Sequence, residues 1–330
     1  MRNFTFKGLL LTAVFALLGC LSIQAADDDL ITKQITIKLD KAGTLPDRIA
    51  SSKKYKITNL KIIGEINGTD WNMIREMAGR NYQESSTEGN LSVLDLSEAK
   101  IVAGGDYYYD DNLFNNKVYT SNDEIGEYAF KDCSRLTSLT LPVGITSIGY
   151  DAFAYCSGLT SLTLPAGITS IGEYAFSRCS GLTSLTLPAG ITSIDKYAFS
   201  GCSRLTSLTL PAGITSIGEF AFSYCSGLTS IYVYAEKVPR IGRYAFEGCA
   251  SRKCTLYVPK GTYDNYRLSE FGYFENIVEF DATGIDKTTT STDVEEVSRY
   301  SLNGQRLAVP VKGLNIVKYS DGTVRKVVVK

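Results

Sequence analysis

Cysteine is the residue type whose spacing most clearly invites a chemical role in this sequence. Six of the eight cysteines recur every 23 or 24 residues: Cys133, Cys156, Cys179, Cys202, Cys225 and Cys249. If each lies on its own stacked strand, neighbouring cysteines are about 4.7–4.9 Å apart, but parallel side chains strain a disulfide. We therefore expect most of them to be free and to fill a core as small apolar residues. Cys249 and Cys254 leave the regular spacing and are the best candidates for one disulfide.

The absence of histidine excludes much of the usual enzyme chemistry. There is no Ser-His-Asp triad, no Cys-His pair, no His-ligated zinc and no imidazole base. Asp106, Asp110 and Asp111 cluster around three tyrosines, but their spacing matches no calcium-loop pattern, so we expect a solvated, inserted loop over 104–116. The formal net charge of −1 argues against a nucleic-acid groove or a polybasic membrane patch. We expect no catalytic residue, metal, cofactor, small-molecule substrate or nucleic acid.

Two sets of side chains are candidates for ligand binding. The first is a row of hydroxyls that faces away from the leucines of each repeat and ends in two tyrosines: Thr140, Thr163, Thr186, Thr209, Tyr232 and Tyr234. Such a row could bind an extended glycan or peptide by hydrogen bonding and stacking, although short hydroxyl side chains also simply suit a solvent-facing strand.

The second set lies beside the cysteines, where the copies differ most, and is expected on the convex side: Tyr155, Arg178 and Tyr224. Tyrosine and arginine are common binding anchors, although scattered exposed aromatic residues are ordinary.

A repeat of 23 residues must position these side chains. Phenylalanine marks the period at Phe130, Phe153, Phe176, Phe199 and Phe222. Within one unit, the alternation over 139–141 predicts a short strand that Pro142 ends, and Phe153 with Cys156 fits one tight helical turn. Since no unit can bury its apolar residues alone, the units must stack. The predicted fold is an α/β leucine-rich-repeat solenoid of mostly short parallel strands.

The repeat is specific enough to carry a family resemblance. The pattern A-F-x-x-C-x-x-L-T-S-L-T-L-P-x-x-I-T-S-I-G over about 125–259 resembles the BspA-type leucine-rich repeat of surface and secreted proteins in Bacteroidetes. That resemblance implies adhesion to host matrix proteins, other bacteria or host receptors.

The end of the chain carries a second resemblance. Residues 293–330, with an Asn303-Gly304 turn and a final K-V-V-V-K, are similar to the C-terminal domains of proteins exported by the type IX secretion system. The stretch 314–316 departs from the aromatic pattern of those domains, and the alternative is a small β module that merely ends the chain.

The remaining segments are expected to be a leader, two caps and a linker. Residues 1–25 have a basic start, an apolar run and small residues, which predicts a secretory signal peptide. Alternatively, 17–20 is a lipobox and Cys20 becomes a lipid anchor. Residues 26–124 are expected to form an irregular N-terminal cap that includes a helix capped by Asp70, and 260–283 a C-terminal cap. The Thr/Ser stretch in 284–292 predicts a linker.

These observations favour a binding protein over an enzyme. The leading hypothesis is a secreted or cell-surface adhesin that binds an extracellular protein, with any membrane attachment through a lipid anchor or the sorting module. The alternatives are a glycan- or mucin-binding protein and a structural surface protein. A carboxylate-dependent hydrolase is least favoured, because the repeats place almost no acids on the strand side.

Overall fold

The structure is a computed structural model that describes residues 29–111, 116–282, 296–301, 306–307, 313–319 and 324–329. The predicted signal peptide, Cys20, the predicted linker and the Asn303-Gly304 turn lie outside the described residues.

Alternating hydroxyl and leucine residues form the principal sheet. In a unit such as Ser138–Thr140 the leucine is buried and its two neighbours are exposed, as the period of two requires. Ten parallel strands pair in chain order. They are β1 (Ile35–Lys38), β2 (Asn59–Ile66), β3 (Val93–Ile101), β7 (Ser138–Thr140), β9 (Ser161–Thr163), β11 (Ser184–Thr186), β13 (Ser207–Leu210), β15 (Ser230–Val233), β17 (Thr255–Pro259) and β18 (Asn276–Phe280).

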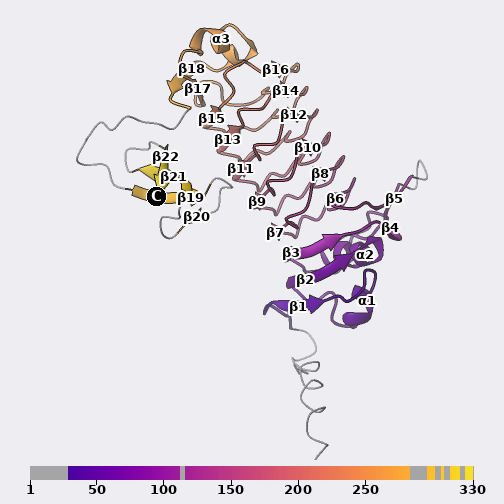
Figure 1. Ribbon diagram of the computed structural model, residues 1–330. Coiled ribbons are helices and arrows are strands. Elements are labelled where there is room, and N and C mark those ends of the chain that lie inside the picture. The colour runs from indigo at the N-terminus through magenta and orange to yellow at the C-terminus, as the bar shows by residue number, and fades with distance from the viewer. Residues whose placement is uncertain are drawn as a thin grey trace, which may run out of the picture. The chain divides into compact units, whose positions relative to one another are not determined.

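Two-residue strands stack on another side of the coils. They form two three-stranded parallel sheets (Figure 1), and the isoleucine of each strand belongs to or packs against the hydrophobic core. They are β6 (Glu124–Ile125), β8 (Ser147–Ile148), β10 (Ser170–Ile171), β12 (Ser193–Ile194), β14 (Ser216–Ile217) and β16 (Arg240–Ile241). The predicted leucine-rich-repeat solenoid is therefore confirmed.

The side that carries phenylalanine and cysteine is not helical, so the predicted helical turn is wrong. The amide of Phe153 donates to Ala175 O of the next coil at 2.7 Å, and that of Tyr155 donates to Ser177 O at 2.8 Å. The intervening amide of Ala154 donates three residues back, to Asp151 O. Every second amide thus bonds between coils, which a helix cannot do because its amides bond within one segment.

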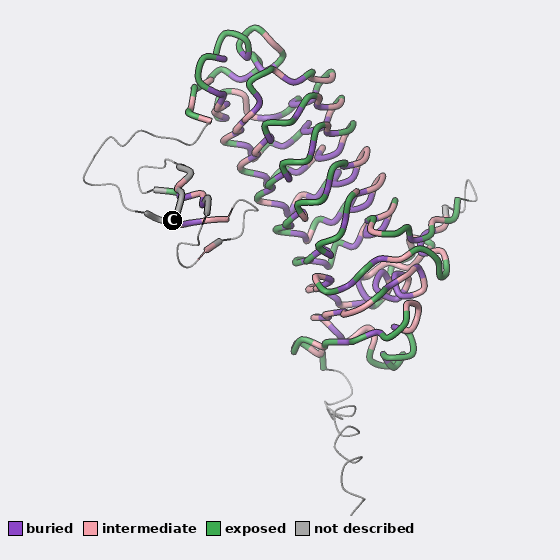
Figure 2. Tube along the Cα trace, viewed as in Figure 1, coloured by how far each residue is buried: buried purple, intermediate pink, exposed green. Residues whose placement is uncertain are grey.

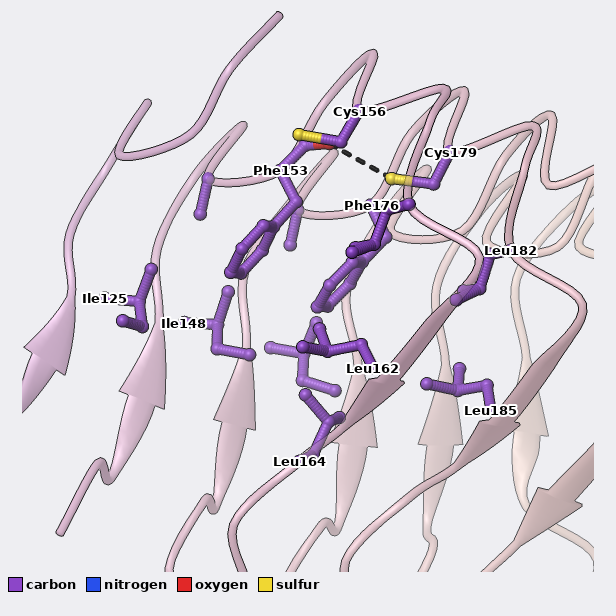
Figure 3. Packing of buried hydrophobic residues seen from close by; sticks show 14 of the residues in the cluster. Ile125, Ile148, Phe153, Cys156, Leu162, Leu164, Phe176, Cys179, Leu182 and Leu185 are labelled. Atoms are coloured by element: carbon purple, nitrogen blue, oxygen red, sulfur yellow. Dashed lines mark hydrogen bonds between the residues drawn. The ribbon is translucent and has the colours of Figure 1, made fainter. Parts of the chain in front are cut away.

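The interior is a stack of identical side chains. Consecutive phenylalanines lie nearly parallel, with ring centroids 4.9 Å apart for Phe153 and Phe176 and 5.1 Å for Phe176 and Phe199. Leucines and isoleucines fill the space between these rings and the two sets of strands (Figure 3). Buried and exposed residues alternate along each coil (Figure 2).

Both ends of the phenylalanine stack are met by other aromatic residues. Trp71 packs on Phe130 with centroids 5.2 Å apart, and its Nε1 donates to Ala129 O at 2.9 Å. At the other end Phe271 and Phe274 contact Phe246 at 5.6 and 5.3 Å. Trp71 belongs to helix α2 (Gly68–Met77), Phe271 belongs to the 3₁₀ helix η1 (Glu270–Tyr273), and Phe274 directly follows η1. The other helices of the described chain are α1 (Leu45–Arg48) and α3 (Tyr263–Arg267).

Asp70 does not cap helix α2, contrary to the sequence expectation. The N-cap is Asn67, whose side chain accepts from the Thr69 amide, and Asp70 is the third helical residue of a capping box. The fully buried Asp70 carboxylate accepts from the amides of Asn67, Gly43 and Leu45 at 2.6–2.9 Å. Asp70 therefore joins α2 to the N-terminal end of α1, a tertiary contact that the local sequence does not reveal.

The segment expected to be a solvated loop is instead largely a hairpin. β4 (Gly104–Asp111) pairs antiparallel with β5 (Asn116–Thr120), and the side chains of Tyr108 and Tyr109 are buried. Tyr108 Oη donates to Glu127 O at 2.8 Å, which ties the hairpin to the first repeat.

A four-stranded antiparallel sheet forms near the end of the chain. Its order is β20 (Arg306–Leu307), β19 (Glu296–Ser301), β21 (Gly313–Tyr319) and β22 (Val324–Val329). Inside it, the buried Arg299 donates to Asn315 Oδ1 at 3.2 Å.

Candidate binding surfaces

The parallel register aligns the predicted hydroxyl row across the principal sheet. Thr140 is opposite Thr163, Thr186 is opposite Thr209, and Thr209 is opposite Tyr232. Thr140, Thr163 and Thr186 are exposed. Within the described residues, the four threonine hydroxyls of this row form no hydrogen bond, so they are available to a ligand.

A neighbouring threonine in the same repeat has a structural role instead. The hydroxyl of Thr160 donates to Thr137 O at 3.2 Å, and that of Thr183 donates to Thr160 O at 3.1 Å. The same contact joins further coils through Thr206 and Thr229. The two threonines of each L-T-S-L-T unit therefore differ: the first holds coils together and the second faces solvent.

The hydroxyl row ends in an aromatic cluster. Tyr232 stacks on Tyr257 with centroids 4.4 Å apart and ring planes 5° from parallel. Tyr234 meets Phe280 edge to face at 5.1 Å. Burial raises the pKa of Tyr232 to about 12 and also raises that of Tyr234, so both phenols stay neutral at neutral pH. Tyr257 and Phe280 extend the cluster beyond the residues that sequence reasoning found.

The opposite end of the same row is charged. Asp95 is opposite Thr140 and Lys61 is opposite Asp95. Lys61 Nζ lies 3.3 Å from the Asp95 carboxylate and 2.7 Å from that of Glu98. The sheet face thus changes along the solenoid from ion pairs through hydroxyls to aromatic rings.

A second surface lies on the phenylalanine-cysteine side of the coils. On this side, two residues per repeat adopt a left-handed backbone conformation, and the chain bends at each of them. In one coil these are Asp151 (φ 53°) and Tyr155 (φ 62°), and in the next Tyr174 and Arg178 (both φ 57°). Because the backbone turns at both points, a groove of about 1100 Å³ runs across successive coils between the two rows of side chains.

The predicted residues Tyr155, Arg178 and Tyr224 line this groove. They occupy equivalent positions in their coils, and each leans on the equivalent residue of a neighbouring coil. The Arg178 guanidinium carbon lies 5.4 Å from the Tyr155 ring centroid, and a Cβ added to Gly248 would fall 2.8 Å from the Tyr224 ring. The structure thus separates the predicted binding residues into two groups, one on the sheet and one in the groove.

The other wall of the groove is an aromatic ladder that the sequence reasoning missed. It comprises Tyr150, Tyr174, Tyr197 and Phe220, with Tyr128 and Tyr244 continuing it at the two ends. Tyr174 and Tyr197 stack with centroids 4.6 Å apart. The signal was an aromatic residue two positions before the repeat phenylalanine, which every coil has except that of Phe153, where Asp151 holds this position and Tyr150 precedes it.

The cysteines are buried thiols rather than a reactive site. All seven described cysteines are free, Cys249 and Cys254 included, so the pair favoured for a disulfide is not bonded. Cys179 Sγ donates to Phe153 O at 3.0 Å (Figure 3). Burial raises the pKa of the Cys179 thiol well above its usual value, which removes the thiolate needed for nucleophilic chemistry.

Metal-binding clusters and membrane-spanning helices are both absent from the described residues. No group of three or more histidine, cysteine or acidic residues is arranged to hold a metal ion. No helix there has the length and apolar character needed to cross a membrane.

Comparison with known proteins gives a family match over the repeats. Residues 123–253 match the family described as "BspA type Leucine rich repeat region", in six copies. A search of curated proteins gave no match.

Solved structures show local likeness to leucine-rich-repeat proteins. The Treponema pallidum leucine-rich-repeat protein is 27% identical over 46% of this chain and 73% of its own, with a TM-score of 0.37. A leucine-rich cell surface protein of Faecalibacterium prausnitzii is 24% identical over 62% of this chain and 49% of its own, with a TM-score of 0.33.

Proposed function

We propose that this chain, whose repeats match the BspA type, is a secreted or cell-surface adhesin that binds an extracellular protein through its principal sheet. One observation supports this proposal. Threonine hydroxyls without a protein hydrogen bond lie in register on neighbouring strands, and the Tyr232–Tyr257 stack follows them. Repeated hydroxyls at strand spacing suit an extended ligand, and tyrosines supply rigid contact area at little entropic cost.

The proposed role is binding and not catalysis. The described cysteine thiols are buried, and the sequence lacks histidine, the side chain that most often activates a hydroxyl as general base. The family resemblance points the same way, because BspA-type repeats are associated with adhesion to matrix proteins, other cells and host receptors.

Solid-phase binding of the protein to immobilised matrix proteins tests the proposal. The double variant Thr163→Lys/Thr186→Lys places two long cations on the exposed row and should weaken binding at least tenfold, because hot-spot contacts cluster at the centre of an interface. Thr192→Lys is the matched control, since Thr192 is also exposed but precedes β12, on another side of the coil.

Three results would contradict this proposal. These are the absence of binding to any matrix protein, equal binding by the double variant, and equal loss in the Thr192 control. Binding of neutral glycans to the same threonine row, with no protein bound, would favour the alternative glycan- or mucin-binding role.

The export route is part of the same proposal. A signal peptide over 1–25 and sorting by the C-terminal module would place the solenoid outside the cell. Deleting 293–330 should then leave the protein undelivered to the surface, as surface labelling would show. Unchanged delivery would leave that module as a small domain that merely ends the chain.

A further inference from the structure

We propose that the groove on the phenylalanine-cysteine side binds an extended anionic glycan, with sugar rings against Tyr155 and Tyr224 and a sugar carboxylate on Arg178. This inference does not depend on the protein ligand proposed for the sheet, because the groove lies on a different side of the coils and involves different residues.

The dimensions of the groove favour a chain-like ligand. Its lining extends from Lys131 to Ser226, across several consecutive coils, and its volume is about 1100 Å³. Tyr155 and Tyr224 are three coils apart, which is about 14 Å at the spacing of stacked strands. Both are exposed, at 43% and 59%. A ligand that reaches both must be an extended oligomer.

The backbone of the groove has little left to offer a peptide. The amides of Tyr155, Arg178 and Gly201 donate to carbonyls of the next coil at 2.6–2.8 Å. A peptide that adds a strand needs unpaired main-chain groups, and these amides are already used. The groove instead presents hydroxyls and aromatic rings to solvent. The hydroxyls come from residues such as Ser157, Ser203 and Ser226.

Hydroxyls and aromatic rings together match the chemistry of sugars. A pyranose ring presents hydroxyls at its edge and C–H bonds on its faces. Serine hydroxyls both donate and accept hydrogen bonds, and tyrosine rings combine an apolar face with a polar tip. In the groove between Tyr155 and Tyr224, serine hydroxyls can therefore bond to the hydroxyls of a sugar chain, and tyrosine rings can pack on its C–H faces.

The charged side chains of the groove favour an anionic glycan. Lys131 already pairs with two carboxylates, Glu84 and Asp151, at 3.3 and 3.2 Å, and Asp132 lies 3.7 Å from an Arg80 nitrogen. Among the described residues, no carboxylate pairs with Arg178. Its guanidinium carbon lies over the Tyr155 ring at 5.4 Å from the centroid, and a guanidinium can bind a carboxylate through two parallel hydrogen bonds.

The repeat itself supplies variants that should fold. Gly201 and Gly248 occupy the position of Arg178 and Tyr224 in other coils, with the same left-handed backbone. Arg178→Gly and Tyr224→Gly therefore remove the side chain without demanding a new conformation. Unchanged melting temperatures would verify this.

Calorimetric titration with three carboxylated probes, oligogalacturonate, hyaluronan and oligosialic acid fragments, tests the proposal. We expect at least one to bind, its methyl-esterified form to bind about tenfold more weakly, and binding to fall with added salt. Arg178→Gly should remove the preference for acid over ester, and Tyr224→Gly should weaken both. Thr163→Lys, on the sheet, should change neither.

Several results would overturn the proposal. These are no binding of any carboxylated probe, equal binding of acid and ester, or stronger binding of a polyglutamate peptide than of any glycan. A preference for sulfated dextran over the carboxylated probes would overturn the carboxylate assignment. Loss of glycan binding in Thr163→Lys but not in Arg178→Gly would place the site on the sheet instead.

Discussion

At the scale of single residues, the cysteine column combines packing with hydrogen bonding. Each thiol from Cys156 to Cys249 donates to the carbonyl of the phenylalanine in the preceding coil, at 3.0–3.3 Å. A thiol is small enough for the interior and still satisfies a main-chain acceptor. The column therefore stabilises the contact between coils without any disulfide.

Buried thiols make the protein sensitive to alkali. Burial raises the pKa of Cys133 from 9.0 to about 11. The folded state then holds its proton where the unfolded state has lost it, so stability falls as pH rises above about 9. Melting temperature measured from pH 7 to 11 should stay level at first and then decline. A smaller decline is expected for Cys133→Ala, and an identical profile for both proteins would contradict the assignment.

The phenylalanine column should carry a large share of the stability. Phe176 is fully buried and stacks on Phe153 and Phe199. Phe176→Ala should cost about 3–5 kcal/mol of unfolding free energy, as deletion of a buried aromatic ring usually does. Urea denaturation followed by circular dichroism measures this. Tyr224→Ala, which removes an exposed ring, should cost less than about 0.5 kcal/mol, and an equal loss in both would show that Phe176 is not core.

At the scale of elements, the space between coils depends on glycine. A Cβ added to Gly181 would lie 2.3 Å from Ser157 O, whereas one added to Gly213 would meet nothing closer than 3.6 Å. Neither glycine has a positive φ, so strain from a left-handed backbone does not affect the comparison. They form a matched pair for testing how closely coils must approach.

Gly181→Ala should therefore destabilise the protein by about 1–3 kcal/mol, the usual cost of overpacking, while Gly213→Ala should be nearly neutral. Thermal melting of both variants checks this. Equal melting temperatures would mean that the coil carrying Gly181 can shift away from its neighbour at no cost.

The elements also show what a sequence can and cannot predict. The period of Phe153, Cys156 and Leu162 revealed the stacking, the core and the strand register, because stacked repeats must align identical residues. The helical turn at Phe153 was wrong because its amides bond to the next coil, and a single unit cannot show this. The Tyr174–Tyr197 ladder was missed because periodicity does not tell which periodic residues border a groove.

At the scale of the whole molecule, stability should vary along the solenoid. Interior strands such as β11 have a parallel neighbour on each side, whereas β1 and β18 are the edge strands of the principal sheet. Contacts in a solenoid are mainly between neighbours, so its ends open more readily than its middle.

Hydrogen–deuterium exchange followed by mass spectrometry should show this gradient. Peptides from β1 and β18 are expected to exchange fastest and those from β9 to β13 slowest. In Phe176→Ala the added exchange should be greatest in the adjoining coils. Uniform exchange along the sheet, in either protein, would show that the described coils unfold together.

Because the repeats stack in register, the number of repeats in such a protein can change during evolution. Units of 23 residues that make the same contacts with their neighbours are interchangeable, so an insertion or deletion of one complete unit would add or remove a whole coil. Each event would lengthen or shorten both the sheet and the groove by about 4.8 Å, without disturbing the coils that remain. The number of repeats would then determine the length of ligand that the protein can bind.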